Sequence, residues 1–257
     1  MSVRSVYVWF GAALIVSVSL SVAALMIARQ FYFNSKLAAV EPVRFSEYFD
    51  ENAAWNRTTR NRHRERPTIV LIGDSRMRAM ICSALQAEWE VLNRGVSGET
   101  SAQMLLRFQS DAINLRPDLI VIQSGINDLV AGMGAKDRRK AITANTISNL
   151  KNAAAQAAAS GSKVILLTVI PPARPEPLRR LVWDESIRDE VAFVNRALSA
   201  WGRPEGVSVL NLSEVFGSEF TLSHEFALDT LHLNDAGNEK LCRRFEEFFG
   251  SPSVLLE

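Results

Sequence analysis

Apolar runs and helical patterns alternate along this chain from residue 68 to near the C-terminus. Short apolar or β-branched runs, typical of buried strands, occupy 68–72, 91–92, 118–123, 163–170 and 207–212. Amphipathic or alanine-rich spacing predicts helices over 76–90, 101–114, 141–160, 185–201 and 235–249, the last with Asn234 as its N-cap. Strands separated by helices predict an α/β fold in which a parallel sheet is covered by helices on both faces.

The N-terminal part of the chain has a different pattern. Residues 5–28 carry no charge, and at about 1.5 Å per residue a helix of this length crosses a bilayer. Aromatic residues, which favour the headgroup region, flank the run: Tyr7 and Trp9 precede its centre, and Phe31, Tyr32 and Phe33 follow it. We therefore expect a single-pass transmembrane helix that acts as a signal-anchor. The alternative is a signal peptide cleaved near 21–23, although such apolar regions are usually shorter, about 7–15 residues.

The residues between this helix and the first strand form a juxtamembrane connector over 29–67. Its last part, 56–67, reads NRTTRNRHRERP, which predicts either a solvated linker or a patch that lies on anionic headgroups. Arg4 on one side of the helix and Arg29 and Lys36 on the other nearly balance the positive-inside count. An extracytoplasmic catalytic domain is favoured mainly by the chemistry of the domain that follows.

Composition limits the class of protein. Hydrophobic residues make up 47% of the chain and charged residues 22%, which allows a sizeable core and excludes a disordered chain. We expect one α/β domain over 68–250. Two cysteines exclude a disulfide-dense scaffold and a four-cysteine zinc site. The net charge of +1 and the lack of interleaved aromatic residues in the basic segment predict no nucleic-acid partner.

Polar, glycine-containing turns follow several of the predicted strands. They are Gly-Asp-Ser at 73–75, the turn at 93–100 and Ser-Gly-Ile-Asn-Asp at 124–128; a further polar turn, Asp-Thr-Leu-His-Leu at 229–233, lies near the C-terminus. Ligands of parallel α/β sheets bind at the carboxyl ends of the strands. The sequence therefore predicts that these turns form one site.

The residue types in these turns are those of nucleophilic catalysis. Ser75 is a candidate nucleophile if a base can reach it, and His232 is the candidate base. Asp229 lies three residues before His232 and can orient its imidazole ring. The backbone N–H groups of Ser75 and Gly98 and the side-chain amide of Asn127 are candidate donors to an oxyanion.

Structural roles are the alternative for each of these residues. Ser75 would then be a helix N-cap, His232 a surface histidine, and Asn127 with Asp128 a simple turn. Ser97 is a rival nucleophile, but its Gly-Val-Ser-Gly context lacks the five-residue G-x-S-x-G elbow of α/β-hydrolases.

Taken in order, the four turns resemble the motifs of the SGNH/GDSL hydrolase family. GDS at 73–75, SGET at 97–100, GIND at 125–128 and DTLH at 229–232 are similar to its nucleophile, glycine, G-x-N-D and D-x-x-H blocks. The stretch VSGETSAQMLLRF is similar to the bacterial thioesterase/lysophospholipase branch. The resemblance implies a three-layer flavodoxin-like fold and serine esterase chemistry without a metal or other cofactor. It makes Ser75, Asp229 and His232 the catalytic triad, and Ser75, Gly98 and Asn127 the oxyanion donors.

These observations predict a membrane-anchored serine esterase that acts through an acyl-enzyme. Its substrate would be a carboxylic ester, either an O-acetyl or acyl group on a cell-envelope glycan or a lipid ester. Acyl transfer to another alcohol and a catalytically silent, membrane-tethered glycan-binding module are the alternatives. Arg76 and Arg78 depart from the small or apolar residues common in the family. They either favour an anionic substrate or lie on an exposed helix face.

Cys82 and Cys242 are placed on two different predicted helices. In the flavodoxin-like arrangement that the resemblance implies, these helices pack side by side on one face of the sheet. The two Cα atoms would then approach the roughly 4.4–6.8 Å that a disulfide requires. An exported domain would allow the bridge to form, and a cytosolic one would keep the thiols reduced. The alternative is two unrelated buried thiols.

Overall fold

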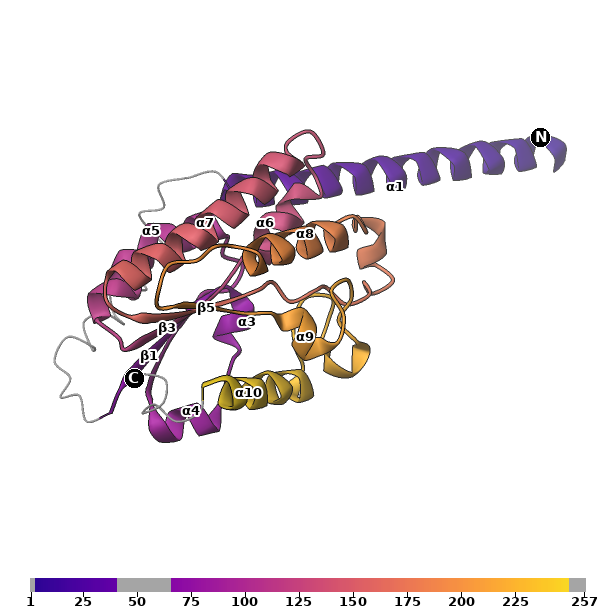
Figure 1. The fold of residues 1–257 in the computed structure, drawn as a ribbon. Helices are drawn as coiled ribbons and strands as arrows, with labels where there is room; N and C mark the ends of the chain where they lie inside the picture. Colours follow the sequence, from indigo (N-terminus) through magenta and orange to yellow (C-terminus); the bar gives the residue numbers. More distant parts are fainter. Residues whose placement is uncertain (1–2, 41–65, 250–257) are drawn as a thin grey trace.

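Five parallel strands form the central sheet, in the order β2-β1-β3-β4-β5 (Figure 1). The computed structural model describes residues 3–40 and 66–249. The strands are β1 (Thr68–Gly73), β2 (Glu90–Gly95), β3 (Leu119–Gln123), β4 (Lys163–Leu167) and β5 (Val207–Leu210). Gly73 pairs with Gly95 of β2 and with Gln123 of β3, so these three strands end level with one another. The predicted α/β fold with a parallel sheet is confirmed.

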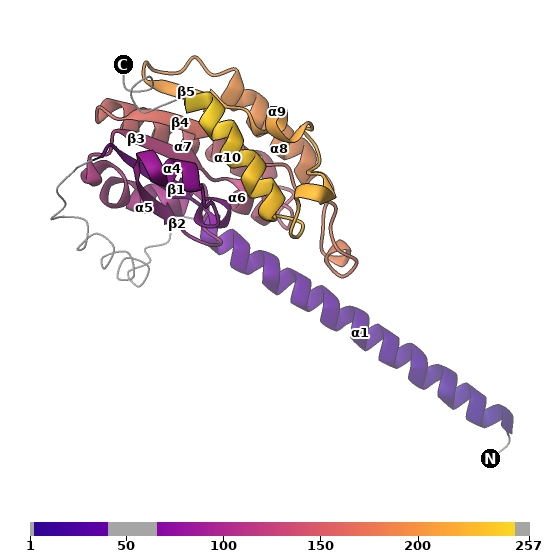
Figure 2. The same cartoon turned by 90° about the horizontal axis from the view of Figure 1, so that it is seen from below.

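Helices cover both faces of the sheet (Figures 1 and 2). One layer contains α5 (Ser101–Asp111), α6 (Ile126–Gly132), α7 (Arg139–Ala159) and α8 (Ile187–Ser199). The other contains α3 (Ser75–Arg78), α4 (Ser83–Glu88), α9 (Leu212–Phe216) and α10 (Asp235–Phe249). Short 3₁₀ turns lie at η1 (Ile113–Leu115), η2 (Arg179–Leu181) and η3 (His224–Phe226).

Each strand contributes side chains to both layers. In β1, Val70 and Ile72 belong to the core under α5–α8, and Ile69 and Leu71 belong to the core under α3, α4, α9 and α10. Burial on both faces explains why the central strands β1, β3 and β4 are nearly continuous apolar runs, whereas the edge strand β2 (EVLNRG) is partly exposed and partly polar.

The helix predicted over 76–90 is divided into α3 and α4. The side-chain amide of Asn93 in β2 donates hydrogen bonds to the carbonyl oxygens of Met77, at 2.9 Å, and Arg78, at 3.3 Å. These bonds satisfy carbonyl groups that a longer helix would use itself, and α3 ends after one turn. The chain then changes direction, so Ile81 is 72% exposed, although in a continuous helix it would lie on the same apolar face as Met77 and Leu85.

Helix α1 (Val3–Val40) extends well beyond residue 28, where the sequence predicted its end. Its segment Ala13–Ala38 is long and apolar enough to cross a membrane, a property that a signal sequence shares. Phe33, near its C-terminal end, is 1% exposed and belongs to the same core as α5–α8. Its ring lies so close to Gly134 that a Cβ on this glycine would be 2.3 Å from it. The end of α1 is thus docked on the α/β domain, which explains why the helix continues there.

The remaining part of the predicted connector, including most of the basic segment 56–67, lies outside the described residues. Asn234 is confirmed as the N-cap of α10, because its side-chain oxygen accepts a hydrogen bond from the backbone N–H of Gly237 at 2.9 Å.

A disulfide joins the two cysteines. Cys82, the residue before α4, is bonded to Cys242 of α10, and their Cα atoms are 5.6 Å apart. Helices α4 and α10 lie side by side on the same face of the sheet in both views (Figures 1 and 2). The predicted proximity of the two cysteines is confirmed.

Candidate active site

Ser75 occupies the sharp turn between β1 and α3. Gly73 ends β1 so close to β3 that a Cβ on it would lie 1.7 Å from the carbonyl oxygen of Gln123. Asp74 is the N-cap of α3, because its side chain accepts a hydrogen bond from the backbone N–H of Arg76 at 2.9 Å. The alternative interpretation made Ser75 the N-cap of this helix, but its neighbour Asp74 has that role. The half-buried Ser75 hydroxyl is available for another partner.

That partner is His232. Ser75 Oγ lies 2.9 Å from His232 Nε2, and His232 Nδ1 lies 2.8 Å from Asp229 Oδ2. The loop between η3 and α10 therefore brings both residues to the carboxyl edge of the sheet. The structure brings together the three residues that the sequence singled out as nucleophile, base and orienting acid.

Asp229 is held as a carboxylate by its own loop. Its Oδ1 accepts hydrogen bonds from the backbone N–H groups of Leu231, at 2.7 Å, and His232, at 2.8 Å. Partial burial alone would raise the pKa of Asp229, but hydrogen bonds from the His232 ring and from these N–H groups outweigh it and lower the pKa. A charged Asp229 fixes the ring with its Nδ1 toward the carboxylate and leaves Nε2 for the serine.

Gly98 and Asn127 lie in the turns that flank Ser75. The turn after β2 contains Gly98, and it is tied to β1 by a hydrogen bond from the backbone N–H of Val96 to the carbonyl oxygen of Gly73, at 2.8 Å. Gly98 is exposed and has a φ of +78°, which favours glycine. Asn127 is the second residue of α6, which follows β3, and its amide donates to the carbonyl oxygen of Glu99 at 3.0 Å. The two turns are therefore bonded to each other across the end of β1.

Behind these turns lies a buried charged cluster that the sequence analysis missed. Arg107 of α5 donates to both carboxylate oxygens of Glu99, to Asp111 at 3.1 Å, and to the carbonyl oxygen of Gly73 at 3.4 Å. Burial disfavours a charged guanidinium, but Glu99 and Asp111 outweigh this effect and raise the pKa of Arg107. One side chain thus joins the end of β1 to the turn that carries Gly98.

Asp128 has a structural role at the turn before α6, as the alternative interpretation of the sequence predicted. Its carboxylate accepts hydrogen bonds from the backbone N–H of Ser101, at 2.8 Å, and from the Ser101 hydroxyl, at 2.7 Å. These bonds join the start of α6 to the start of α5. Burial raises the pKa of Asp128 to about 6, although the bonds from Ser101 lower it.

Arg76 is neither on an exposed helix face nor open to an anionic substrate, and both predictions for it are wrong. Its side chain is buried and donates to the carbonyl oxygens of Leu231 and Ile170, each at 2.6 Å. Arg78, two residues later, is exposed as expected for a helix face. Burial lowers the pKa of Arg76 to about 10 and raises that of Asp74 to about 6, while each charge stabilises the other. Arg76 therefore ties the nucleophile turn to the loop that carries the histidine.

Within the described residues, no group of three or more histidine, cysteine, aspartate or glutamate side chains is arranged to hold a metal ion. The chemistry that the arrangement supports directly is acyl transfer by a serine that is hydrogen-bonded to a histidine and an aspartate.

A sheet of this topology with such a serine, histidine and aspartate at its carboxyl edge defines a serine hydrolase of the α/β class. The model of the GDSL-like lipase/acylhydrolase family matches residues 47–240, so the chain belongs to that family. The predicted family is confirmed, and the protein is an enzyme that hydrolyses esters.

Individual relatives agree with this assignment. The esterase TesA of Pseudomonas aeruginosa is 31% identical over 120 residues, which cover 41% of this chain and 56%, or just over half, of that esterase. The platelet-activating factor acetylhydrolase IB subunit alpha1 of Bos taurus is 29% identical over 183 residues, covering 69% of this chain and 72% of that protein. The structure of a GDSL-like lipase from Bacteroides thetaiotaomicron aligns with a TM-score of 0.62 at 26% identity, covering 78% of this chain and 96% of the lipase.

Proposed function

We propose that this protein is a membrane-anchored serine esterase in which Ser75 is the nucleophile, His232 the general base and Asp229 the residue that orients it. The observation that supports the proposal most directly is the continuous contact from Ser75 Oγ to His232 Nε2, at 2.9 Å, and from His232 Nδ1 to Asp229, at 2.8 Å. These distances lie within the range over which a proton passes between side chains.

In the proposed mechanism, Ser75 Oγ attacks the ester carbonyl while His232 Nε2 accepts the hydroxyl proton. Asp229 stabilises the imidazolium that forms. The backbone N–H groups of Ser75 and Gly98 and the amide of Asn127 donate to the oxyanion. His232 then returns the proton to the departing alcohol, which leaves an acyl group on Ser75. Water activated by the same histidine attacks this acyl-enzyme and releases the acid.

The role of Ser75 is tested with the full chain in detergent and a chromogenic acetyl ester. Ser75→Ala should abolish turnover and labelling by a fluorophosphonate without changing the melting temperature. Ser97→Ala is the matched control, because Ser97 is the rival serine and lies exposed in the turn after β2. Turnover that survives in Ser75→Ala, or that is lost in Ser97→Ala, would overturn the assignment.

The role of Asn127 makes a separate prediction. Removal of one oxyanion donor typically lowers kcat by 10²–10³-fold, because the contact is made mainly in the transition state. Asn127→Ala should therefore lower kcat by about this factor and change KM much less. Since the Asn127 amide also bonds to Glu99, the melting temperature of the variant is measured alongside. A variant that loses only substrate affinity would make Asn127 a ground-state binding residue.

We further propose that α1 anchors the enzyme and that the catalytic domain is extracytoplasmic. The length and apolar composition of α1 support the first statement. The Cys82–Cys242 disulfide supports the second, because such bridges persist in oxidising compartments. The protein should remain in the membrane fraction at high salt and at alkaline pH. A mature N-terminus near Ala24 would identify a cleaved signal peptide instead. For an anchored, extracytoplasmic enzyme, the proposed substrate is an acyl ester of the cell envelope, on a glycan or a lipid.

A further inference from the structure

The loop between β4 and α8 presents large apolar side chains to solvent. Leu178 is 83% exposed and Leu181 is 59% exposed, the latter in the 3₁₀ turn η2. Arg174 and Arg180 are also exposed and lie on either side of Leu178 in the sequence. Adjacent exposed leucines bordered by arginines are a composition that fits the boundary between headgroups and acyl chains of a bilayer.

Two of the three acidic residues of this loop are paired with arginines of neighbouring helices, so they do not cancel the positive charge around the leucines. Asp184 pairs with Arg139 of α7 at 2.6 Å, and Glu185 pairs with Arg188 of α8 at 2.9 Å. Glu176 is exposed and keeps its charge, because its hydrogen-bond donors in Thr230 are neutral. The segment 174–182 still has a net charge of +2, from three arginines and one glutamate, and this charge suits an anionic surface.

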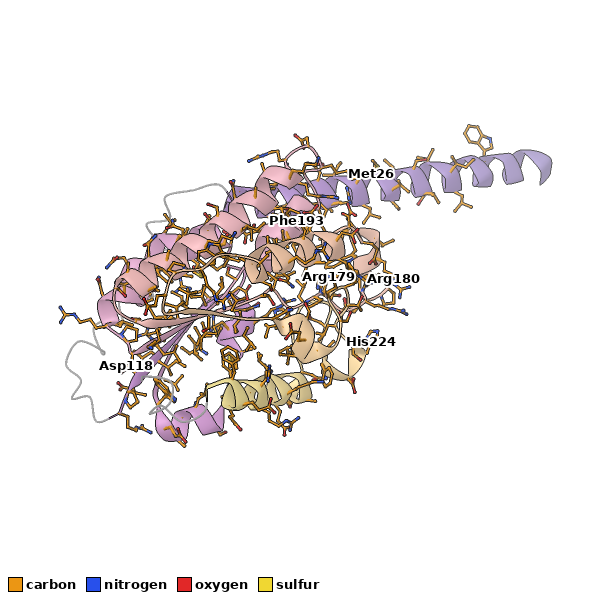
Figure 3. The ribbon with its side chains drawn as sticks, in the orientation of Figure 1. Met26, Asp118, Arg179, Arg180, Phe193 and His224 are labelled. Carbon is orange, nitrogen blue, oxygen red and sulfur yellow. A yellow bond between two sulfur atoms is a disulfide. The ribbon has the colours of Figure 1, made fainter. Side chains whose placement is uncertain are left out.

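The loop lies on the side of the domain from which α1 projects. Figures 1 and 2 both show α1 leaving the domain beyond α6, and the loop before α8 extends toward the same side. In Figure 3, the labelled Arg179 and Arg180 are on this side, as is Met26 of α1. Because Phe33 docks the end of α1 into the core, this direction is fixed relative to the domain. The bilayer that α1 enters would face the loop.

The same loop is bonded to the catalytic loop. Glu176 accepts hydrogen bonds from the backbone N–H of Thr230, at 2.9 Å, and from its hydroxyl, at 2.6 Å. The backbone N–H of Ala173 donates to the carbonyl oxygen of Thr230 at 2.9 Å. Thr230 is fully buried and directly follows Asp229, two residues before His232. A contact between this loop and a bilayer would therefore lie beside the catalytic residues.

We propose that the segment 174–182 is a docking surface for the anionic phospholipid bilayer that holds α1, with Leu178 and Leu181 among the acyl chains and Arg174 and Arg180 against phosphates. The open edge of the site then faces the membrane, and its substrate is an ester held in that bilayer. This inference rests on the proposed esterase and anchor, and it goes beyond them by naming the surface and by favouring a lipid ester over a glycan ester.

The docking is tested directly with a fluorescent probe on the full chain. Leu178→Cys provides a single free thiol, because the two native cysteines are bridged, and it is labelled with nitrobenzoxadiazole. The label at position 178 should emit at shorter wavelength in vesicles of phosphatidylcholine and phosphatidylglycerol than it does in detergent-free nanodiscs of phosphatidylcholine alone. Ile81→Cys is the matched control, because it is 72% exposed and lies near the disulfide, and its emission should not differ. Equal emission from both probes in the anionic vesicles would overturn the docking.

The consequence for the substrate is tested by comparing two esters in the same vesicles. Leu178→Asp/Leu181→Asp should lower turnover of a fluorogenic phospholipid ester by about 10²-fold, roughly tenfold per leucine. Turnover of a water-soluble acetyl ester should be unchanged. Arg174→Gln/Arg180→Gln should reduce the dependence on phosphatidylglycerol. Ile81→Asp should change neither activity.

The outcomes separate this inference from the proposed function. A parent enzyme that cleaves the soluble acetate but no vesicle-held ester would overturn the substrate assignment and leave the esterase intact. A double leucine variant that loses both activities equally would overturn the docking role. A parent without any esterase activity would refute the proposed function, and the probe at position 178 would still report whether the loop contacts the bilayer.

Discussion

Arg76 connects the nucleophile to the histidine loop, and replacing it tests how the site is held together. Arg76→Met keeps much of the side-chain volume and removes two charged hydrogen bonds, to Leu231 and Ile170, each at 2.6 Å. Hydrogen bonds to a charged group are worth about 1.5–3 kcal/mol each. Because the variant also avoids the cost of burying a charge, we expect the free energy of unfolding to fall by about 3 kcal/mol, at the low end of their sum.

Arg76→Met should lower kcat by more than its loss of folding stability alone would cause. Leu231 directly precedes His232, and without its anchor the imidazole loses its alignment with Ser75 Oγ. A displacement of about 1 Å costs about 10²-fold in rate. Arg76→Met should therefore have a kcat about 100-fold lower and a nearly unchanged KM for a soluble acetyl ester. Its activity should also decline at a higher pH on the acid side, because loss of the nearby cation raises the pKa of Asp74 and Asp229.

Two further variants make this prediction refutable. Arg78→Met removes the exposed arginine of the same short helix and should change neither the rate nor the pH profile. Arg76→Lys can reach one of the two carbonyl groups and should recover part of the rate. If Arg76→Met lost stability but kept the parent's kcat and pH profile, Arg76 would be only a structural residue and the reasoning would be refuted.

Three other predictions concern the docking of α1, a buried carboxylate and the disulfide. Phe33→Ala should lower the free energy of unfolding by about 3–5 kcal/mol in urea titrations, whereas Phe31→Ala, at a site 75% exposed, should change it by less than about 0.5 kcal/mol; equal effects would contradict the docking. Burial holds the pKa of Asp128 at about 6, above its unfolded value of 3.8, so the folded state binds more protons and this group lowers stability as pH rises from about 4 to 6. Asp128→Asn should remove that contribution in unfolding experiments across this range, and an unchanged slope would disprove it. Cys82→Ser should cost about 5 kcal/mol, since the bridge spans 160 residues, and native parent should react with a thiol reagent only after reduction. Reaction of Cys82 and Cys242 without reductant would contradict an oxidising location.

The sheet was predictable because central strands buried on both faces carry apolar runs, as 69–72 and 119–122 do. The break in the helix over 76–90 was not. It depends on the side chain of Asn93, which comes from a neighbouring strand and bonds to carbonyl groups of α3. A cap supplied by a distant residue leaves no trace in the local pattern.

The residues of the candidate site were predictable for a related reason. Parallel strands place the turns that follow them at one edge, so Ser75 and Asn127 could be grouped without a structure, whereas His232 follows no strand directly and was added through the resemblance of its D-x-x-H motif. Arg76 and Arg107 could not, because a buried arginine and an exposed one have the same signature in a sequence. What distinguishes Arg76 is a carbonyl oxygen that lies 155 residues away in the chain.

The order of residues along the chain has a consequence for biosynthesis. Ser75 and His232 are separated by 157 residues and lie near the two ends of the catalytic domain. At about 5–20 residues per second, the ribosome adds His232 roughly 8–30 s after Ser75. During that interval the nascent chain has the Ser75 hydroxyl but lacks the histidine that contacts it in the folded domain. Under the proposed mechanism, the growing chain would therefore be inert toward esters until Asp229 and His232 have been added, and α10, which follows them, brings the second cysteine of the disulfide.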